Sequence, residues 1–137
     1  MAKAKRKPAR GRVRIRGAPK LKARVWVEFA GGEPALTDAG ADLLEQIIAC
    51  GSLSEAARRL RFSYRRAWML VDAMNRRWPA PIVITAVGGE HGGGTRLTEL
   101  GELVLRTYRD TQLQVEHLLG EAERAFARAA RDATRSR

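Results

Sequence analysis

The chain has 137 residues, the size of one domain with room for a modest core. Its net charge of +11 comes from residues 1–24, which hold eleven Lys and Arg and no acid, because fifteen basic and fifteen acidic residues cancel in the rest. One cysteine excludes an intramolecular disulfide, and no apolar run reaches the roughly 18 residues of a membrane span, so we expect a cytoplasmic protein without a membrane partner.

Residues 1–20 combine many cations with proline and glycine and offer almost nothing to bury, so we expect a disordered basic tail. From Leu21 the pattern alternates with period two. The apolar positions are Ala23, Val25, Val27 and Phe29. This alternation predicts a half-buried strand, which the segment 31–34 closes.

Three helices are predicted next. Thr37 is a suitable N-cap for a first helix from Asp38 to about Cys50, and Gly51 suits the left-handed position after its end. The predicted core-facing stripe of this helix is Leu43, Leu44, Ile47 and Ile48. Ser52 and Glu55 form a capping box that opens a second helix to Leu60.

Ser63 can cap the third helix, Tyr64 to about Arg77. At 100° per residue, one side of this helix is apolar: Ala67, Leu70, Val71 and Met74. The opposite side carries Arg65, Met69, Asp72 and Arg76. Trp68 lies at the edge of the buried side, which favours a place in the core over a contact with a partner and leaves both open.

The segment Ile82–Val87 is rich in β-branched residues and is followed by a glycine-rich loop and a short Arg96-Leu97. This pattern predicts a β-hairpin, or wing. A nucleotide-binding P-loop is excluded because Gly94 stands where that motif needs lysine.

Thr98 begins a fourth, longer helix to about Arg128. A heptad-like seam predicts that it coils against a second copy of the chain. The predicted dimerisation residues are Tyr108, Thr111, Val115, Leu118, Ala122 and Ala125, and Ala129 continues their spacing. We therefore expect a tail (1–20), a winged helix-turn-helix domain (21–97), a long dimerisation helix (98–130) and a frayed end (131–137).

The local sequences sharpen this interpretation. Ser63-Tyr64-x-x-Ala67-Trp68, Met74-Asn75 and the Gly92–Thr98 segment G-G-G-x-x-L-T together resemble the N-terminal DNA-binding domain of the ModE family of molybdate-responsive regulators. A more distant resemblance is to LysR-type regulators. Family members that respond to molybdate carry C-terminal oxyanion-binding domains, and the sequence in hand stops where those would begin. The resemblance therefore implies a dimeric DNA binder linked to molybdate metabolism. We expect no cofactor.

Seven arginines against one aspartate in residues 58–77 favour DNA over simple helix packing. Arg65 is the first choice for a guanine, Met69 for a thymine methyl, and Arg96 anchors the wing, whereas Arg66 with the hydroxyls of Ser63 and Tyr64 suits phosphates. The full set of candidate DNA-binding residues is Ser52, Ser63, Tyr64, Arg65, Arg66, Trp68, Met69, Arg76, His91 and Arg96.

These predictions add up to a mainly α, winged helix-turn-helix transcriptional regulator in the nucleoid, binding double-stranded DNA as a homodimer on a palindromic operator. Half-sites would lie about one helical turn, or a multiple, apart. Two alternatives stay open, namely an architectural DNA binder driven by the basic tail and a protein-interaction adaptor. With only His91 and His117 and no paired carboxylates suited to acid–base chemistry, an enzyme or metal site is not expected. The operator, and whether the protein activates or represses, stay open.

Overall fold

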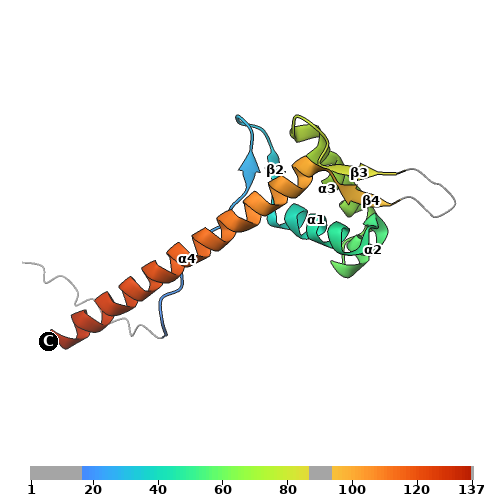
Figure 1. The fold of residues 1–137 in the computed structure, drawn as a ribbon. Helices are drawn as coiled ribbons and strands as arrows, with labels where there is room; N and C mark the ends of the chain where they lie inside the picture. The colour runs from blue at the N-terminus through green and yellow to red at the C-terminus, as the bar shows by residue number, and fades with distance from the viewer. Residues whose placement is uncertain (1–16, 87–93, 137) are drawn as a thin grey trace, which may run out of the picture.

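The structure is a computed structural model that describes residues 17–86 and 94–136 (Figure 1). Within these residues the elements are β1 (Val27–Glu28), β2 (Pro34–Leu36), α1 (Asp38–Cys50), α2 (Leu53–Arg59), α3 (Tyr64–Arg77), β3 (Val83–Thr85), β4 (Thr95–Leu97) and α4 (Glu99–Arg135). Three helices, a two-stranded hairpin and a long last helix form the winged helix-turn-helix arrangement. The predicted fold class, mainly α with a small β wing, is confirmed.

Each helix begins at a hydroxyl side chain, as the sequence predicts. The N-cap hydroxyl accepts a hydrogen bond from the backbone N–H three residues further on, at 3.0 to 3.3 Å. These N-caps are Thr37, Ser52, Ser63 and Thr98. Gly51 ends α1 at a φ of 67°, in the left-handed region that glycine adopts without strain. The helix bounds are therefore determined largely by local sequence.

One apolar core lies between α1, α2 and α3 and is closed by the wing and the first turns of α4. Its largest fully buried side chains are Leu36, Leu43, Leu44, Ile47 and Ile82. The predicted stripe on α1 is wrong at Ile48, which is 57% exposed, because one residue beyond Ile47 the helix has turned about 100° away from the core. Leu70 on α3 is only half-buried.

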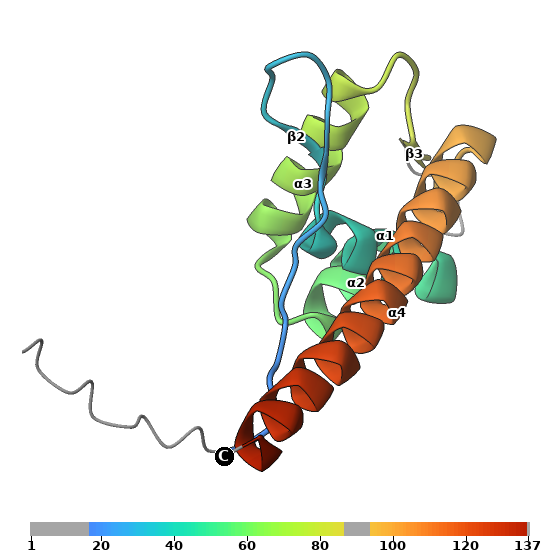
Figure 2. The same cartoon turned by 90° about the vertical axis from the view of Figure 1, so that its left-hand side faces the viewer.

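The predicted strand at residues 21–29 is much shorter in the structure. Only β1 pairs, antiparallel to β2, a strand that the sequence analysis did not predict. Residues 20–26 have no strand partner and instead run beside α4 (Figures 1 and 2). There the Leu21 N–H donates to Glu123 at 2.9 Å, and the Tyr108 hydroxyl donates to the Val25 carbonyl at 2.7 Å. We call residues 20–26 the strap.

The predicted wing is confirmed as an antiparallel pair of β3 and β4, with Val83 opposite Leu97, Ile84 opposite Arg96 and Thr85 opposite Thr95. The loop at 87–93, which holds His91, lies outside the described residues. A hydrogen bond of 2.9 Å from the Thr95 N–H to the Gly51 carbonyl ties the wing to the end of α1.

Helix α4 spans 37 residues, or about 55 Å. It continues to Arg135, beyond the end predicted near residues 128–130. Its first turns pack into the core through Val104, Leu105 and Tyr108, and the remainder projects away from it (Figure 1). Among the described residues, no helix is both long and apolar enough to cross a membrane.

Candidate nucleic-acid interface

The outward side of α3 combines cations with exposed apolar side chains. Arg65, Arg66 and Arg76 are exposed, and so are three large side chains of the same helix. These are Tyr64, Trp68 and Met69. Only Ala67, Val71 and Met74 of α3 are fully buried. The structure therefore brings most of the predicted recognition residues onto one accessible surface.

The sequence analysis favoured a core position for Trp68, and this prediction is wrong, because the Trp68 side chain is 53% exposed. Helix α3 meets α2, α1 and β2 along a narrow stripe. Ala67 occupies that stripe, and the next residue turns about 100° out of it. The Trp68 indole is thus an exposed aromatic surface on the side of α3 that is predicted to face DNA.

The arginines around the helix-turn-helix differ in how they are neutralised. Arg58 and Arg59 pair with Glu55, Arg76 with Asp72, and Arg77 with Glu33. Three others have no ion-pair partner among residues 17–86 and 94–136: Arg61, Arg65 and Arg66. These three are the free positive charges of this surface, and each is exposed.

Arg61 was not among the predicted site residues. It sits in the turn between α2 and α3 with a φ of 57°, in the left-handed region that a residue other than glycine rarely adopts. The turn itself was predicted, because the second helix was expected to end at Leu60 and the third to be capped by Ser63. The Arg61 backbone conformation depends on how α2 and α3 pack, so only its charge could have marked it in the sequence.

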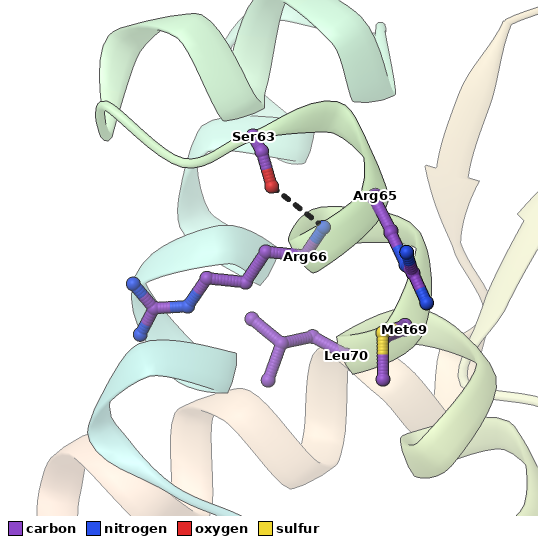
Figure 3. Close-up of a pocket in the computed structure, with 5 residues that line it drawn as sticks. All are labelled: Ser63, Arg65, Arg66, Met69 and Leu70. Carbon is purple, nitrogen blue, oxygen red and sulfur yellow. Dashed lines mark hydrogen bonds between the residues drawn. The ribbon is translucent and has the colours of Figure 1, made fainter.

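Arg65 and Arg66 border a shallow hollow on α3, with Ser63, Met69 and Leu70 (Figure 3). The guanidinium of Arg66 lies over the Phe62 ring, 4.0 Å from its centroid, and points away from Arg65. Stacking on a ring limits where the Arg66 charge can reach, whereas Arg65 extends freely. The Ser63 hydroxyl is exposed but already accepts the Arg66 N–H at 3.1 Å.

Two ion pairs on α2 lower the local positive charge. The hydrogen bonds from Arg58 hold the pKa of Glu55 at about 2, well below its ordinary value, and Arg59 adds to this effect. The same contact raises the pKa of Arg58. Ser52, predicted to touch DNA, is half-buried and caps α2, with its hydroxyl 3.1 Å from that of Ser54.

The wing contributes Arg96, which is exposed on β4 between the buried Thr95 and Leu97. This alternation follows from the period of a strand, in which neighbouring side chains face opposite sides. His91 cannot be placed because it lies outside the described residues. Within the described part of the wing, Arg96 is therefore the predicted DNA-binding residue that the structure places in the candidate interface.

Along α4 the predicted dimerisation residues divide into two groups. The prediction of Tyr108 as a dimerisation residue is wrong, because its side chain is 3% exposed. Its hydroxyl donates to the Val25 carbonyl and to Asp38 of the same chain. The other five follow the outer part of the helix. Thr111, Leu118 and Ala125 are exposed, and Val115 and Ala122 are half-buried.

Two exposed apolar residues on α4 were missed. Phe126 is 58% exposed and lies on the same side as Val115 and Ala122 at 100° per residue, so the helical periodicity could have found it. Leu103 is also exposed, and it lines an apolar groove of 340 Å³ between α4, β1 and Trp78. This groove continues the outer seam toward the core.

The acidic cluster of α1 serves the fold. Arg109 donates to Glu45 at 2.6 Å and to Asp42 at 2.5 Å, and Gln112 donates to Asp38. These contacts hold α4 against α1, and those with Glu45 and Asp42 raise the pKa of Arg109 above its ordinary value. Within the described ranges, no group of three His, Cys, Asp or Glu is arranged to hold a metal ion.

Comparison with known proteins agrees with the predicted resemblance. The chain is 39% identical over 85 residues to "Molybdenum transport protein ModE" of Azotobacter vinelandii, covering 62% of this chain and 32% of that protein. It is 40% identical over 75 residues to "Transcriptional regulator ModE" of Haemophilus influenzae, covering 55% of this chain and 29% of that protein.

A third relative is "DNA-binding transcriptional dual regulator ModE" of Escherichia coli (strain K12), 36% identical over 66 residues, covering 48% of this chain and 25% of that protein. The chain thus spans about a third or less of the length of these curated relatives. No protein-family model matches it. The chain resembles part of the ModE regulators, as the motifs around Ser63–Trp68 and Gly92–Thr98 predicted.

Proposed function

We propose that this protein is a DNA-binding transcriptional regulator linked to molybdenum, acting as a homodimer on a palindromic operator in the bacterial nucleoid. The observation that carries the proposal is the outward side of α3. It presents the unpaired Arg65 beside the exposed Trp68 and Met69, on a helix of the width that a DNA major groove admits. The similarity to proteins named as transcriptional regulators supports the same conclusion.

Each candidate residue has a distinct role in the proposal. Arg65 reads a guanine through its two terminal nitrogens, and Met69 contacts a thymine methyl. Phosphates are contacted by residues that position the helix without reading sequence. This second group is Ser52, Ser63, Tyr64, Arg66, Arg76, His91 and Arg96, and we add Arg61. Trp68 contacts the sugar–phosphate edge of the groove.

The homodimer is supported by the outer part of α4. A helix of about 55 Å with exposed Leu118 and Phe126 has more apolar surface than its own core can cover. A second copy that packs its α4 along the same seam would cover both side chains. Two-fold symmetry would then present two recognition helices to two half-sites of a palindrome.

Selection of binding sites from random DNA tests the proposal. We expect the wild-type protein to enrich one palindromic motif. Substitution Arg65→Ala should reduce discrimination at one base pair of each half-site by about 1–3 kcal/mol, because a bidentate guanine contact is lost. Arg106→Ala removes an exposed arginine from α4 and is the matched control.

The R106A protein should enrich the wild-type motif unchanged. Recovery of unselected DNA by the wild-type protein would contradict sequence-specific binding. Loss of affinity without any change in base preference in R65A would remove Arg65 from direct reading and leave it as a phosphate contact.

The molybdenum link is tested separately by sequencing the DNA that the protein retains in cells of its own organism. The expected result is retention of regions beside genes for molybdenum uptake or use, by analogy with the names of the relatives. Retention of DNA beside unrelated genes would mean that the protein regulates a different process.

A second candidate, an architectural DNA binder, is favoured by the eleven cations of residues 1–24. In that case the basic tail would supply most of the affinity, and binding would not depend on sequence. The selection experiment separates the two functions, since an architectural protein enriches no motif.

A further inference from the structure

The end of the recognition helix is tied to the wing by one side-chain amide. Asn75, in the last turn of α3, accepts hydrogen bonds through Oδ1 from the backbone N–H groups of Ile82 (2.9 Å) and Val83 (3.1 Å). Its Nδ2 donates to the Val83 carbonyl at 3.0 Å. Val83 is the first residue of β3, so the amide occupies the backbone groups at the start of the wing.

The same short segment also holds α4. The Thr98 N–H donates to the Ile82 carbonyl at 3.1 Å, and the Thr98 hydroxyl donates to the Pro81 carbonyl at 2.8 Å. A Cβ on Gly101 would lie 2.1 Å from the Ile82 carbonyl oxygen, so only glycine permits this approach. The recognition helix, the wing and the long helix therefore meet at residues 81–83.

The chemistry of this junction needs an asparagine. Two neighbouring backbone N–H groups require an acceptor, and the adjacent carbonyl requires a donor, which a single carboxamide provides from one side chain. Alanine would leave these backbone groups at the fully buried Ile82 and the buried Val83 without their partners. Aspartate would keep the acceptor and lose the donor.

We propose that Asn75 is a positioning residue for DNA binding: it holds the wing at a fixed angle to the recognition helix, so that Arg96 reaches DNA when Arg65 does. Arg96 lies opposite Ile84 in the wing, one residue beyond the clamped Val83. Arg65 lies ten residues before Asn75, about 15 Å along α3. This inference rests on the proposed DNA-binding function, and its site is the joint between the two contacting elements.

A double-mutant cycle on the full chain tests it. Arg96→Ala should weaken DNA binding roughly tenfold through the lost charged contact. Asn75→Ala should weaken it by a similar factor, because the wing no longer holds Arg96 in place. The double variant should bind almost as well as either single variant, since both substitutions remove the same contact.

A substitution that only destabilises the fold would behave differently. Ile47→Val lies in the buried part of α1, away from the junction, so any loss of DNA affinity that it causes should multiply with the loss caused by R96A. The DNA affinity of Asn75→Asp should fall between those of wild type and N75A. Hydroxyl-radical footprints should show that N75A loses only the protection that R96A also loses. If circular dichroism shows N75A to be unfolded, N75D carries the same cycle.

Multiplicative losses in N75A/R96A, or a footprint that weakens uniformly, would overturn the inference. The outcome is distinguishable from failure of the proposed function. A wild-type protein that prefers no sequence fails that function, yet the coupling between Asn75 and Arg96 can still be measured on any DNA that it binds.

Discussion

Trp68 lies in the second turn of α3 and Trp78 caps the end of this helix, and their side chains have opposite environments. The Trp78 indole donates to the Ala35 carbonyl at 3.0 Å, and its ring meets Phe29 edge-on with centroids 5.0 Å apart. Trp68 is exposed, and its indole makes no hydrogen bond within the part of the chain that the structure describes. Trp78 therefore stabilises the fold, whereas Trp68 is available to a partner.

The two tryptophans give a matched pair of variants. Trp68→Ala should change the free energy of unfolding by less than about 0.5 kcal/mol, as expected at an exposed position, and should weaken DNA binding. Trp78→Ala should destabilise the fold by about 2 kcal/mol or more through lost packing and an unpaired Ala35 carbonyl. Urea unfolding measures the change in stability, and DNA titration measures the change in affinity. A Trp68→Ala protein as unstable as Trp78→Ala would show that Trp68 packs in the core.

Tyr108 is the residue whose role the structure changes most. Its hydroxyl joins the strap to α4 through Val25 and reaches Asp38 at 3.2 Å, at the start of α1. Burial raises the pKa of Tyr108 to about 12, and the charge of Asp38 adds to the shift. The folded state therefore favours the neutral phenol.

The raised pKa predicts how stability changes at high pH. The contribution of Tyr108 is fully present below its ordinary pKa of 10 and is lost as pH rises toward 12, because the unfolded chain releases this proton first. Tyr108→Phe should lower stability at pH 7 by about 0.5–1.5 kcal/mol and flatten the decline between pH 10 and 12. Tyr64→Phe, at an exposed tyrosine, should keep the wild-type profile in denaturant unfolding. Identical profiles for Y108F and wild type would contradict this account.

At the scale of elements, α4 has two parts with different surroundings. As far as Tyr108 it is a core helix, Arg109 and Gln112 still bind acidic side chains of α1, and farther out the strap lies beside it (Figure 2). Leu118 (62% exposed) lies on the seam, whereas Leu113 (63% exposed) points about 140° away from it around the helix, and the two border one shallow hollow with Gln114 and His117. The two leucines differ in direction and hardly at all in exposure.

This pair tests dimerisation through the seam. If the proposed dimer forms, Leu118→Glu should convert it to a monomer, because the substitution would place a carboxylate in an apolar interface. Leu113→Glu should leave the dimer intact, and glutamate suits an exposed helix position as well as leucine does. Analytical ultracentrifugation decides the outcome, and equal dissociation of both variants would exclude a seam on this side.

For the whole molecule, the start of the strap is held against the outer part of α4. Leu21 and Lys20 are anchored to Glu123, in the outer half of α4. The eight cations of residues 1–16, which supply most of the net charge, precede this anchored segment in the sequence and lie at least 48 residues before the start of α3. Most of the net charge and the proposed reading of DNA sequence thus belong to different parts of the chain.

Removing residues 1–16 should separate these two contributions. Because each neutralised phosphate adds about 0.9 to the log–log salt slope, the truncated protein should show a slope smaller by up to about 7. Its ranking of DNA sequences should stay as in the full chain, since α3 and the wing are untouched. Affinity titrations from low to moderate salt measure the slope, and loss of the ranking would favour the architectural function.

Much of this fold could be predicted because its signals are local. The caps at Thr37, Ser52, Ser63 and Thr98 depend on side chains three residues from the groups they bind, and Gly51 depends on its own backbone freedom. The strand at 21–29 was overestimated because alternation shows a half-buried segment but cannot show that a neighbouring strand exists. That segment met a helix instead.

The sequence by itself determined the four helices, the wing and the basic side of α3, because periodicity and capping act over a few residues. Only the tertiary structure decided that Trp68 is exposed, that Tyr108 is buried against the strap, and that Asn75 bridges α3 to β3. Each of these depends on segments that lie far apart in the chain or on the width of a packed stripe. Their positions follow from which surfaces meet, and local sequence does not encode that.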